Sequence, residues 1–144
     1  EADHQDTLDV IHRVGYSFLY SFPYSMREKT KAYHRLTDDI PMEIKSRRHL
    51  EIHEVFRHHA HIRNQSYIGQ THLCLIEGPS KRAPDTQLAG RNDYNTRVIF
   101  SKEIPDSNES LQIGDYVEVR IDSATSQSLK GTPLKRTTLK DFHL

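Results

Sequence analysis

The stretch LAGRNDYNTRVIF, residues 88–100, places two arginines symmetrically around a turn. The pattern indicates two short strands joined by the loop residues 93–95, with Asn95 in the left-handed backbone position that a three-residue hairpin loop needs. In that register Arg91 lies opposite Arg97, and like charges facing each other destabilise a ladder. The repulsion is tolerable if both side chains extend into water, and it becomes useful if a phosphate lies between them. The pair therefore predicts a phosphate-binding hairpin.

A second basic group follows an apolar strand in EGPSKR, residues 77–82. A Gly-Pro pair turns the chain there, and we expect Ser80, Lys81 and Arg82 to project from the loop. Residues 67–144 carry ten Lys or Arg and ten Asp or Glu. The bases gather on the first three strands and the last hairpin, and the acids lie between them, so the barrel can present a basic face. Loops at the mouth of such a barrel hold nucleic acid in related folds.

The histidines are a weaker candidate for chemistry. Five of the ten fall within residues 49–61, and the pairs His49/His53 and His58/His61 are spaced to share a helix face and to bind a metal. A zinc site needs further ligands, and the chain has neither an HExxH motif nor paired cysteines, so a solvated, mildly basic helix face is the preferred interpretation. The single cysteine, Cys74, lies between apolar neighbours and is predicted to be a core residue.

Composition limits the classes of function. Lys and Arg number 20 and so do Asp and Glu, so only local clustering of charge can support nucleic-acid binding. Hydrophobic residues make up 35% of the 144, which is low for a self-sufficient domain, and some surface is expected to meet a partner or another domain. No run of 18 apolar residues is present, which predicts no membrane span. The chain opens as if inside a helix, which indicates a fragment of a longer protein with its targeting region upstream.

These residues need elements to position them. Helical spacing predicts a helix over 3–14 that ends at Gly15, and Pro41 opens a second helix to about residue 65. Between them, residues 17–24 have the alternation of a strand. The second helix has a predicted apolar stripe: Ile44, Ile52, Val55, Phe56 and Ile62. Five strands are then expected near 69–77, 86–92, 96–101, 114–123 and 127–136, which describe a small antiparallel OB-like barrel.

Several of these segments together resemble one family. YSMREKT, residues 24–30, resembles the Tyr-Ser-x-Arg-x-x-Thr element of the radical-SAM tRNA methylthiotransferases of the MiaB type. EGPSKR, LAGRNDYNTRVIF and GDYVEVRIDSATSQSLKG resemble successive pieces of the TRAM domain that ends those enzymes. AYHRLTDDIP and GRNDYN resemble the eukaryotic, mitochondrial branch, which is named for its association with a cyclin-dependent kinase regulatory subunit.

The resemblance implies an α+β fragment: the tail of a radical-SAM α/β partial barrel over 1–40, a last helix and connector over 41–66, and a five-stranded antiparallel OB-like TRAM barrel over 67–140. Such enzymes add a methylthio group to C2 of N6-isopentenyladenosine next to the tRNA anticodon. They use two 4Fe–4S clusters and S-adenosylmethionine, both expected upstream of this chain. The family arginine near the substrate corresponds to Arg27.

The cluster cysteines of the family are absent here, so the chain is not expected to be active alone. Its expected role is to position tRNA, because a closed barrel with basic loops suits a structured RNA better than B-DNA. The residues expected to bind the RNA phosphates are Lys81, Arg82, Arg91, Arg97 and Lys130. Tyr94, at the hairpin tip, is either a base-stacking residue or an ordinary exposed turn aromatic.

A non-catalytic adaptor that docks a protein partner through the barrel or the His-rich helix is the alternative function. By resemblance that partner is the kinase regulatory subunit. A mitochondrial location is expected from the branch, with a cytoplasmic one as the alternative.

Overall fold

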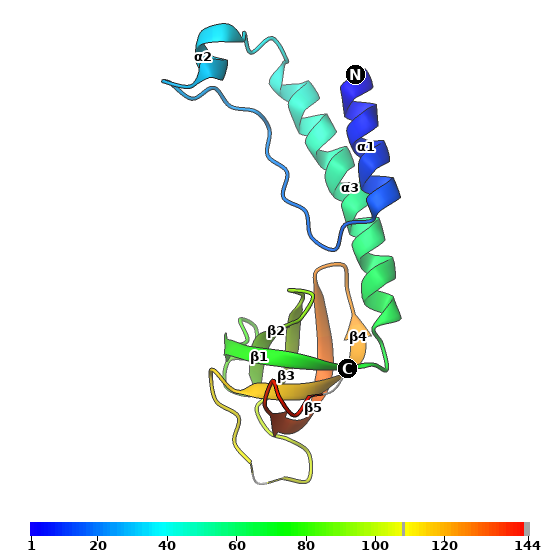
Figure 1. Cartoon of the computed structure of the whole chain (residues 1–144), viewed down its shortest axis with the longest axis vertical. Coiled ribbons are helices and arrows are strands. Elements are labelled where there is room, and N and C mark those ends of the chain that lie inside the picture. Colours follow the sequence, from blue (N-terminus) through cyan, green and yellow to red (C-terminus); the bar gives the residue numbers. More distant parts are fainter. Residues whose placement is uncertain (108, 143–144) are drawn as a thin grey trace. The chain divides into compact units, whose positions relative to one another are not determined.

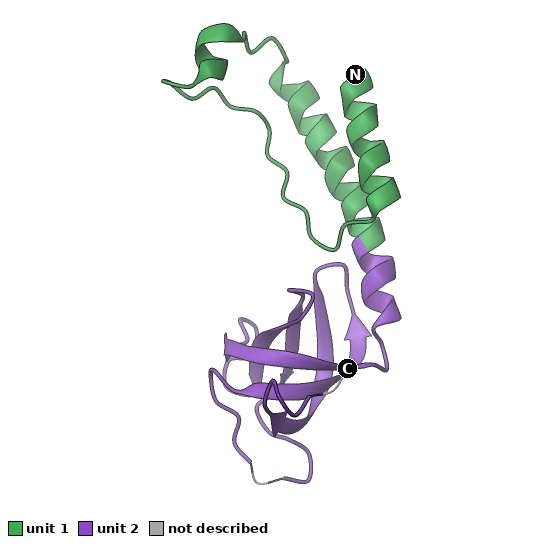
Figure 2. Cartoon of the chain, in the orientation of Figure 1, with its two compact units in different colours: residues 1–59 green, residues 60–144 purple. Residues whose placement is uncertain are grey.

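The computed structural model of the chain describes residues 1–107 and 109–142. It divides into two compact units, residues 1–59 and residues 60–144, coloured green and purple in Figure 2. Each unit has its own packing and is described by itself.

The first unit contains α1 (Ala2–Val14), α2 (Lys31–Arg35) and most of α3 (Met42–Ser66), shown in Figure 1. The predicted end of α1 at Gly15 is confirmed, because Gly15 has a left-handed φ of 59° and donates its N–H to the carbonyl of Ile11 at 2.9 Å. α3 begins after Pro41, whose carbonyl accepts the N–H groups of Ile44 and Lys45. Proline suits this position because the first N–H groups of a helix have no partner within the helix.

Polar contacts reinforce the packing of α1 on α3. Ile11 is buried, and the buried His4 places Nε2 2.6 Å from the Glu51 carboxylate. Arg47 binds both Glu1 and Glu51 at 2.8 Å. The first unit is therefore held by a small apolar contact surrounded by charged groups.

The predicted apolar stripe of α3 is wrong at its end. Ile62 is 55% exposed, whereas the earlier members of the stripe are half-buried. Asn64 is the buried residue in this last stretch, and its Nδ2 donates to the Thr125 carbonyl at 2.7 Å. The last turn of α3 belongs to the second unit, and there it presents an amide rather than an isoleucine to the barrel.

The predicted strand over 17–24 is also wrong. The segment has no strand structure, although Phe18, Tyr20 and Phe22 do contact one another in series, with ring centroids 4.6 and 6.3 Å apart. Tyr20 is 73% exposed and Phe22 82%. Strand structure needs a neighbouring strand to pair its backbone, and the described strands pair only with one another.

The second unit is a closed barrel with the strand order β1-β2-β3-β5-β4 (Figure 1). Its strands lie within two residues of the predicted ranges: Thr71–Pro79, Gln87–Asn92, Arg97–Ser101, Tyr116–Ala124 and Ser128–Thr137. The all-antiparallel expectation is wrong for one pair, since β3 and β5 run parallel. Directions can alternate around a ring only if the number of strands is even, so five strands must include a parallel pair.

Inward side chains fill the barrel and form its core: Cys74, Ile76, Leu88, Val98, Phe100, Ile104, Leu111, Val117, Val119, Ile121 and Leu129. Cys74 is fully buried, which confirms the prediction that it is a core residue. A Cβ at Gly131 would lie 2.3 Å from the Arg120 carbonyl, so this position admits only glycine where β4 and β5 approach closely. Full burial of a large aliphatic or aromatic side chain contributes about 1.5–3 kcal/mol to the stability of the fold. This core therefore fixes the strands that carry the outward-facing residues described next.

Candidate nucleic-acid interface

The hairpin between β2 and β3 has the predicted geometry. Arg91 pairs with Arg97 in the ladder, and the Asn92 N–H donates to the Thr96 carbonyl at 3.2 Å. Asn95 has a left-handed φ of 59° and donates its N–H to Asn92 at 2.9 Å. The predicted three-residue loop and register are confirmed.

The two facing arginines differ in what binds them. The Arg91 guanidinium lies 3.3 Å from a Glu77 carboxylate oxygen and donates to the backbone and side-chain oxygens of Asn95 at 2.9 and 3.0 Å. Arg97 has a buried Nε without a hydrogen-bond partner among the described residues. Glu77 thus offsets the repulsion on one side, and Arg97 has no ion-pair partner among the described residues.

Lys130 extends the basic surface to a third strand. β3 pairs with β5 so that Arg97 lies opposite Ser128 and Ile99 opposite Lys130. Leu129 is buried and Lys130 is exposed, so Lys130 points outward, on the side of the barrel where Arg91 and Arg97 lie. The structure gives Arg97 and Lys130 no ion pair within the described residues. β2, β3 and β5 therefore carry three adjacent outward cations.

The loop from residue 80 to residue 86 carries two further predicted cations. The expectation that Ser80 projects from this loop is wrong, since Ser80 is 2% exposed. Its N–H donates to the Gln87 carbonyl at 2.9 Å, and its hydroxyl accepts the Ala83 N–H at 3.2 Å. A small hydroxyl beside a turn commonly bonds to the backbone in this way. Lys81 and Arg82 are exposed on a turn that Ser80 holds in place.

This loop and the hairpin lie at opposite ends of β2. From Gln87 to Asn92 the strand rises roughly 17 Å, at about 3.4 Å per residue. The five predicted cations therefore do not converge on one phosphate. They form two groups at the ends of one strand.

Three other cations of the barrel are paired with its acids. Lys135 lies 3.0 Å from Glu118, to which it is paired in the ladder between β4 and β5. Arg120 binds Asp122 at 3.2 Å, and Arg136 lies 3.8 Å from Asp115. These pairs explain how a barrel with balanced charge keeps a face with unpaired cations.

Tyr94 is an exposed aromatic of the hairpin turn, and its role as a base-stacking residue stays a prediction. It is 53% exposed, and its ring stacks on the Tyr67 ring with centroids 5.1 Å apart and an interplanar angle of 13°.

Sequence reasoning missed the role of Asn92 and His72. Asn92 is buried, accepts the Thr96 N–H on Oδ1 at 2.8 Å, and places Nδ2 2.8 Å from Nδ1 of the buried His72. The available signal was an amide at an inward position of β2, in alternation with Leu88 and Gly90.

Arg27 belongs to the first unit, in the turn before α2. Its carbonyl accepts the Thr30 hydroxyl at 2.8 Å, and the same hydroxyl accepts the Tyr33 N–H as the cap of α2. Arg27 lines an open pocket of about 320 Å³ with Tyr24 and Ser25. Its placement near a substrate stays a prediction.

Two histidines of α3, His49 and His53, lie side by side. The His49 and His53 rings lie 4.4 Å apart, and the Ser21 hydroxyl is within 3.2 and 3.4 Å of their nitrogens. Within residues 1–107 and 109–142, no group of three or more His, Cys, Asp or Glu side chains is arranged to hold a metal ion.

Burial raises the pKa of the Cys74 thiol to about 12. No helix in the described part of the chain is long and apolar enough to cross a membrane.

Residues 65–134 match the TRAM domain family. The chain is 49% identical over 147 residues to the mitochondrial tRNA methylthiotransferase CDK5RAP1 of Homo sapiens, which covers 98% of this chain and 24% of that protein. It is 39% identical to the CDK5RAP1-like protein of Oryza sativa subsp. japonica, over 99% of this chain and 25% of that one. It is 44% identical to the tRNA-2-methylthio-N(6)-dimethylallyladenosine synthase of Christiangramia forsetii, over 93% of this chain and 26% of that one. The chain thus spans about a quarter of the length of these relatives.

Proposed function

Because the chain belongs to the tRNA methylthiotransferase family, with whose C-terminal portion it aligns, we propose that it is the C-terminal part of a tRNA-2-methylthio-N6-isopentenyladenosine methylthiotransferase. Its role is to bind tRNA and to position it for methylthiolation at C2 of the adenosine next to the anticodon. The observation that carries this proposal is a TRAM barrel with an outward row of cations, of which Arg97 and Lys130 have no ion pair among the described residues.

Two cation groups suit a nucleic-acid backbone better than a single anion. Arg91, Arg97 and Lys130 would hold phosphates at one end of β2, and Lys81 and Arg82 would hold others roughly 17 Å away. Such contacts supply affinity and register without reading sequence. The exposed ion pair between Arg91 and Glu77 is worth about 0–1 kcal/mol, so a phosphate can replace Glu77 as the partner of Arg91.

The chemistry is proposed to lie outside this chain. The family uses 4Fe–4S clusters and S-adenosylmethionine, and a cluster is held by thiolates. Cys74 does not fit as a ligand because it is fully buried and its raised pKa keeps it a thiol. The residues of this chain hold and orient RNA, and the other three quarters of the enzyme would carry the cofactors.

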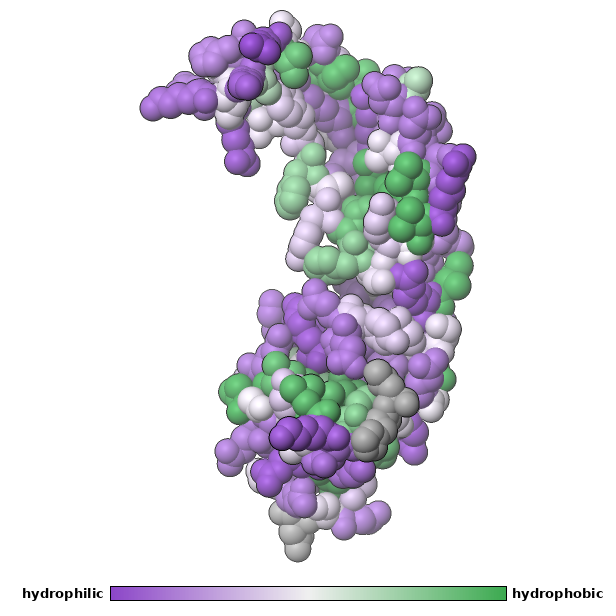
Figure 3. All heavy atoms as spheres, viewed as in Figure 1, coloured by the Kyte–Doolittle hydropathy of each residue, from purple (hydrophilic) through white to green (hydrophobic). Residues whose placement is uncertain are grey.

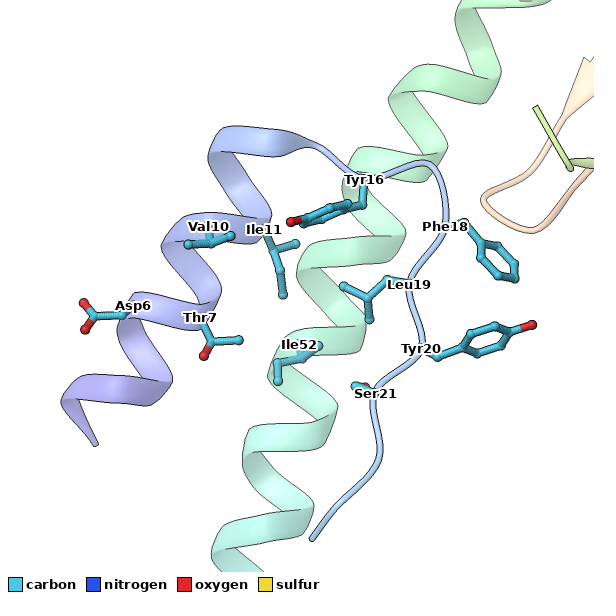
Figure 4. A pocket seen from close by; sticks show the side chains of 10 residues that line it. All are labelled: Asp6, Thr7, Val10, Ile11, Tyr16, Phe18, Leu19, Tyr20, Ser21 and Ile52. Carbon is cyan, nitrogen blue, oxygen red and sulfur yellow. The ribbon is translucent and has the colours of Figure 1, made fainter. Parts of the chain in front are cut away.

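The first unit is proposed to complete the catalytic part. Residues 1–40 would form the end of the radical-SAM barrel, with 41–66 as its last helix and connector and 67–140 as the RNA-binding barrel. An open pocket of about 580 Å³ supports this role, with Val10 and Ile11 from α1, Ile52 from α3 and Leu19 around it (Figure 4). Figure 3 shows hydrophobic side chains at the surface of this unit. The rest of the enzyme would cover them and bring Arg27 near the substrate.

The relatives named as mitochondrial support a mitochondrial location for this chain. A second candidate function is the docking of a protein, such as a cyclin-dependent kinase regulatory subunit, through the barrel or the His-rich helix. The exposed Leu50 and Ile62 on that helix favour it.

Salt-dependent tRNA binding tests the proposal. Binding of the 144-residue chain to tRNA is expected to weaken linearly in log K against log salt, with a slope of about −0.9 per phosphate contact. The double variant Arg97→Gln, Lys130→Gln is expected to bind about tenfold more weakly at low salt and to reduce the slope by about 2. The matched control is Lys135→Gln. Lys135 lies on the same strand as Lys130, but it is already paired with Glu118 of β4, so its loss is expected to change the affinity little.

Affinity that ignores salt and the double variant would contradict the phosphate row. A loss of log K in Lys135→Gln about half as large as in the double variant would reduce the effect to net charge, because the single variant removes one charge and the double variant two.

A further inference from the structure

Tyr94 presents one ring face to the protein and the other to solvent. The inner face stacks on Tyr67 at 5.1 Å and 13°, and 53% of the residue remains exposed. We propose that the open face of Tyr94 receives one unpaired RNA base, so that this barrel selects a single-stranded or looped nucleotide over a continuous duplex. The inference rests on the proposed function, because it names the class of RNA that the same barrel binds.

The ring beneath Tyr94 is fixed in place. Tyr67 is buried, its N–H donates to the Asn64 carbonyl at 3.2 Å, and its ring meets the His72 ring edge-on at 4.8 Å and 70°. Burial and the neighbouring Tyr94 raise the pKa of Tyr67, so its ring stays neutral near pH 7. A base that stacks on Tyr94 therefore extends an existing two-ring stack.

A chain of hydrogen bonds also holds the hairpin that carries Tyr94. A backbone N–H can only donate, so the Asn92 atom facing Thr96 N is Oδ1, and Nδ2 donates to His72 Nδ1. His72 then carries its proton on Nε2, which lies 3.4 Å from Gln70 Oε1. Burial lowers the pKa of His72, which favours this neutral form. The hairpin is thus positioned before any ligand binds, and little ordering is needed on binding.

The surroundings of Tyr94 favour a nucleotide over another flat ligand. The Arg91 guanidinium reaches the turn at Asn95, the residue after Tyr94, and Arg97 lies opposite Arg91 in the ladder without an ion pair among the described residues. A base on the ring would therefore carry its phosphate toward two guanidinium groups. Inside a duplex both faces of each base are already stacked, so only a loop, a bulge or an end offers a free face.

The test compares a single-stranded RNA that contains 2-aminopurine with a duplex of the same length, each bound to the 144-residue chain. Tyr94→Ala is expected to lose about tenfold in affinity for the single strand, to lose the quenching of 2-aminopurine, and to leave the duplex affinity and the salt slope unchanged. Tyr94→Phe restores the ring and is expected to restore the quenching. Ile113→Ala, which truncates an exposed side chain of the same unit, is the control for surface apolar loss.

Single-strand binding and quenching that persist in Tyr94→Ala would overturn the stacking site. An equal loss for single strand and duplex would overturn it too, since it would assign Tyr94 a structural role. In either case salt-sensitive binding by the wild-type chain would leave the proposed function standing. If the wild-type chain binds neither RNA, the proposed function fails and this inference fails with it.

Discussion

The two arginines at the base of the hairpin resolve their repulsion by unequal partnership. Arg91 is held by Glu77 and by both oxygens of Asn95, whereas Arg97 has no ion-pair partner among the described residues. An incoming phosphate therefore competes with an existing partner at one arginine only. The like-charge pair, which is unfavourable in an ordinary ladder, is consistent with an anion that arrives from outside.

Asn92 is the residue on which the geometry of the hairpin depends most. Asn92→Ala leaves both the Thr96 N–H and His72 Nδ1 without their partner inside the barrel. Loss of partners for buried polar groups costs about 1–3 kcal/mol, and we expect the barrel to lose that much in the free energy of unfolding measured by urea. Gln112→Ala, an exposed amide in the loop before β4, is expected to change stability by less than about 0.5 kcal/mol. Equal stabilities of the two variants would show that the hydrogen bonds of Asn92 to Thr96 and His72 contribute nothing to the stability of the barrel.

At the scale of elements, the sequence predicted what short-range chemistry decides. Asn95 adopts the left-handed backbone expected of it and α1 ends at Gly15 as expected, so the hairpin register and the end of α1 followed from single residues. Ser80 was misplaced because its outward or inward direction depends on a bond to Ala83 across the turn. The strand over 17–24 was misplaced because strand structure depends on a neighbour, which no pattern within the segment supplies.

The stack beneath Tyr94 was beyond prediction for a similar reason. Tyr67 and Tyr94 are 27 positions apart in sequence, and only barrel closure brings their rings together. The sequence marked Tyr94 as exposed and aromatic, which is half of the site.

The first unit contains groups whose charge depends on pH. Burial lowers the pKa of His53, and the nearby His49 and Arg57 lower it further. A lowered histidine pKa means that folding favours the neutral ring. Its contribution to stability is therefore present above pH 6.5 and is lost as the pH falls through the lowered pKa.

Glu51 acts in the same direction at more acid pH. Hydrogen bonds from His4 and Arg47 lower its pKa from 4.5, so its contribution is present above pH 4.5 and is lost as the pH falls through the lowered value. We expect the melting temperature of the helical signal, followed by circular dichroism, to fall from pH 7.5 to 5.5 and again below 4.5. Glu51→Gln should reduce the second fall and keep the first; the rest of the second fall comes from Glu1, because hydrogen bonds from Arg47 and Arg48 lower its pKa to about 2. A melting temperature that is constant over this range would refute the assignment.

The two units of the molecule differ in how their backbone groups are paired. The barrel is a closed ring of strands, whereas the helical unit contains an extended segment without a strand partner among the described residues. The barrel strands satisfy one another around a ring, whereas residues 17–24 carry exposed aromatics and have no strand partner among the described residues. The relatives are about four times as long as this chain. The contrast is expected if the missing length supplies the neighbours of the helical unit.

Hydrogen exchange measures this contrast directly. Backbone N–H groups of residues 18–27 donate no hydrogen bond to other described residues, so we expect them to exchange nearly as fast as in an unfolded peptide. Amides of β1 to β5 should be protected by the full stability of the barrel. In a protein of the full length of the relatives, the same segment should become protected, because a neighbouring strand would then accept its N–H groups. Protection in the 144-residue chain alone would mean that the segment has found a partner already. A dependence of that protection on protein concentration would identify the partner as a second copy of the chain.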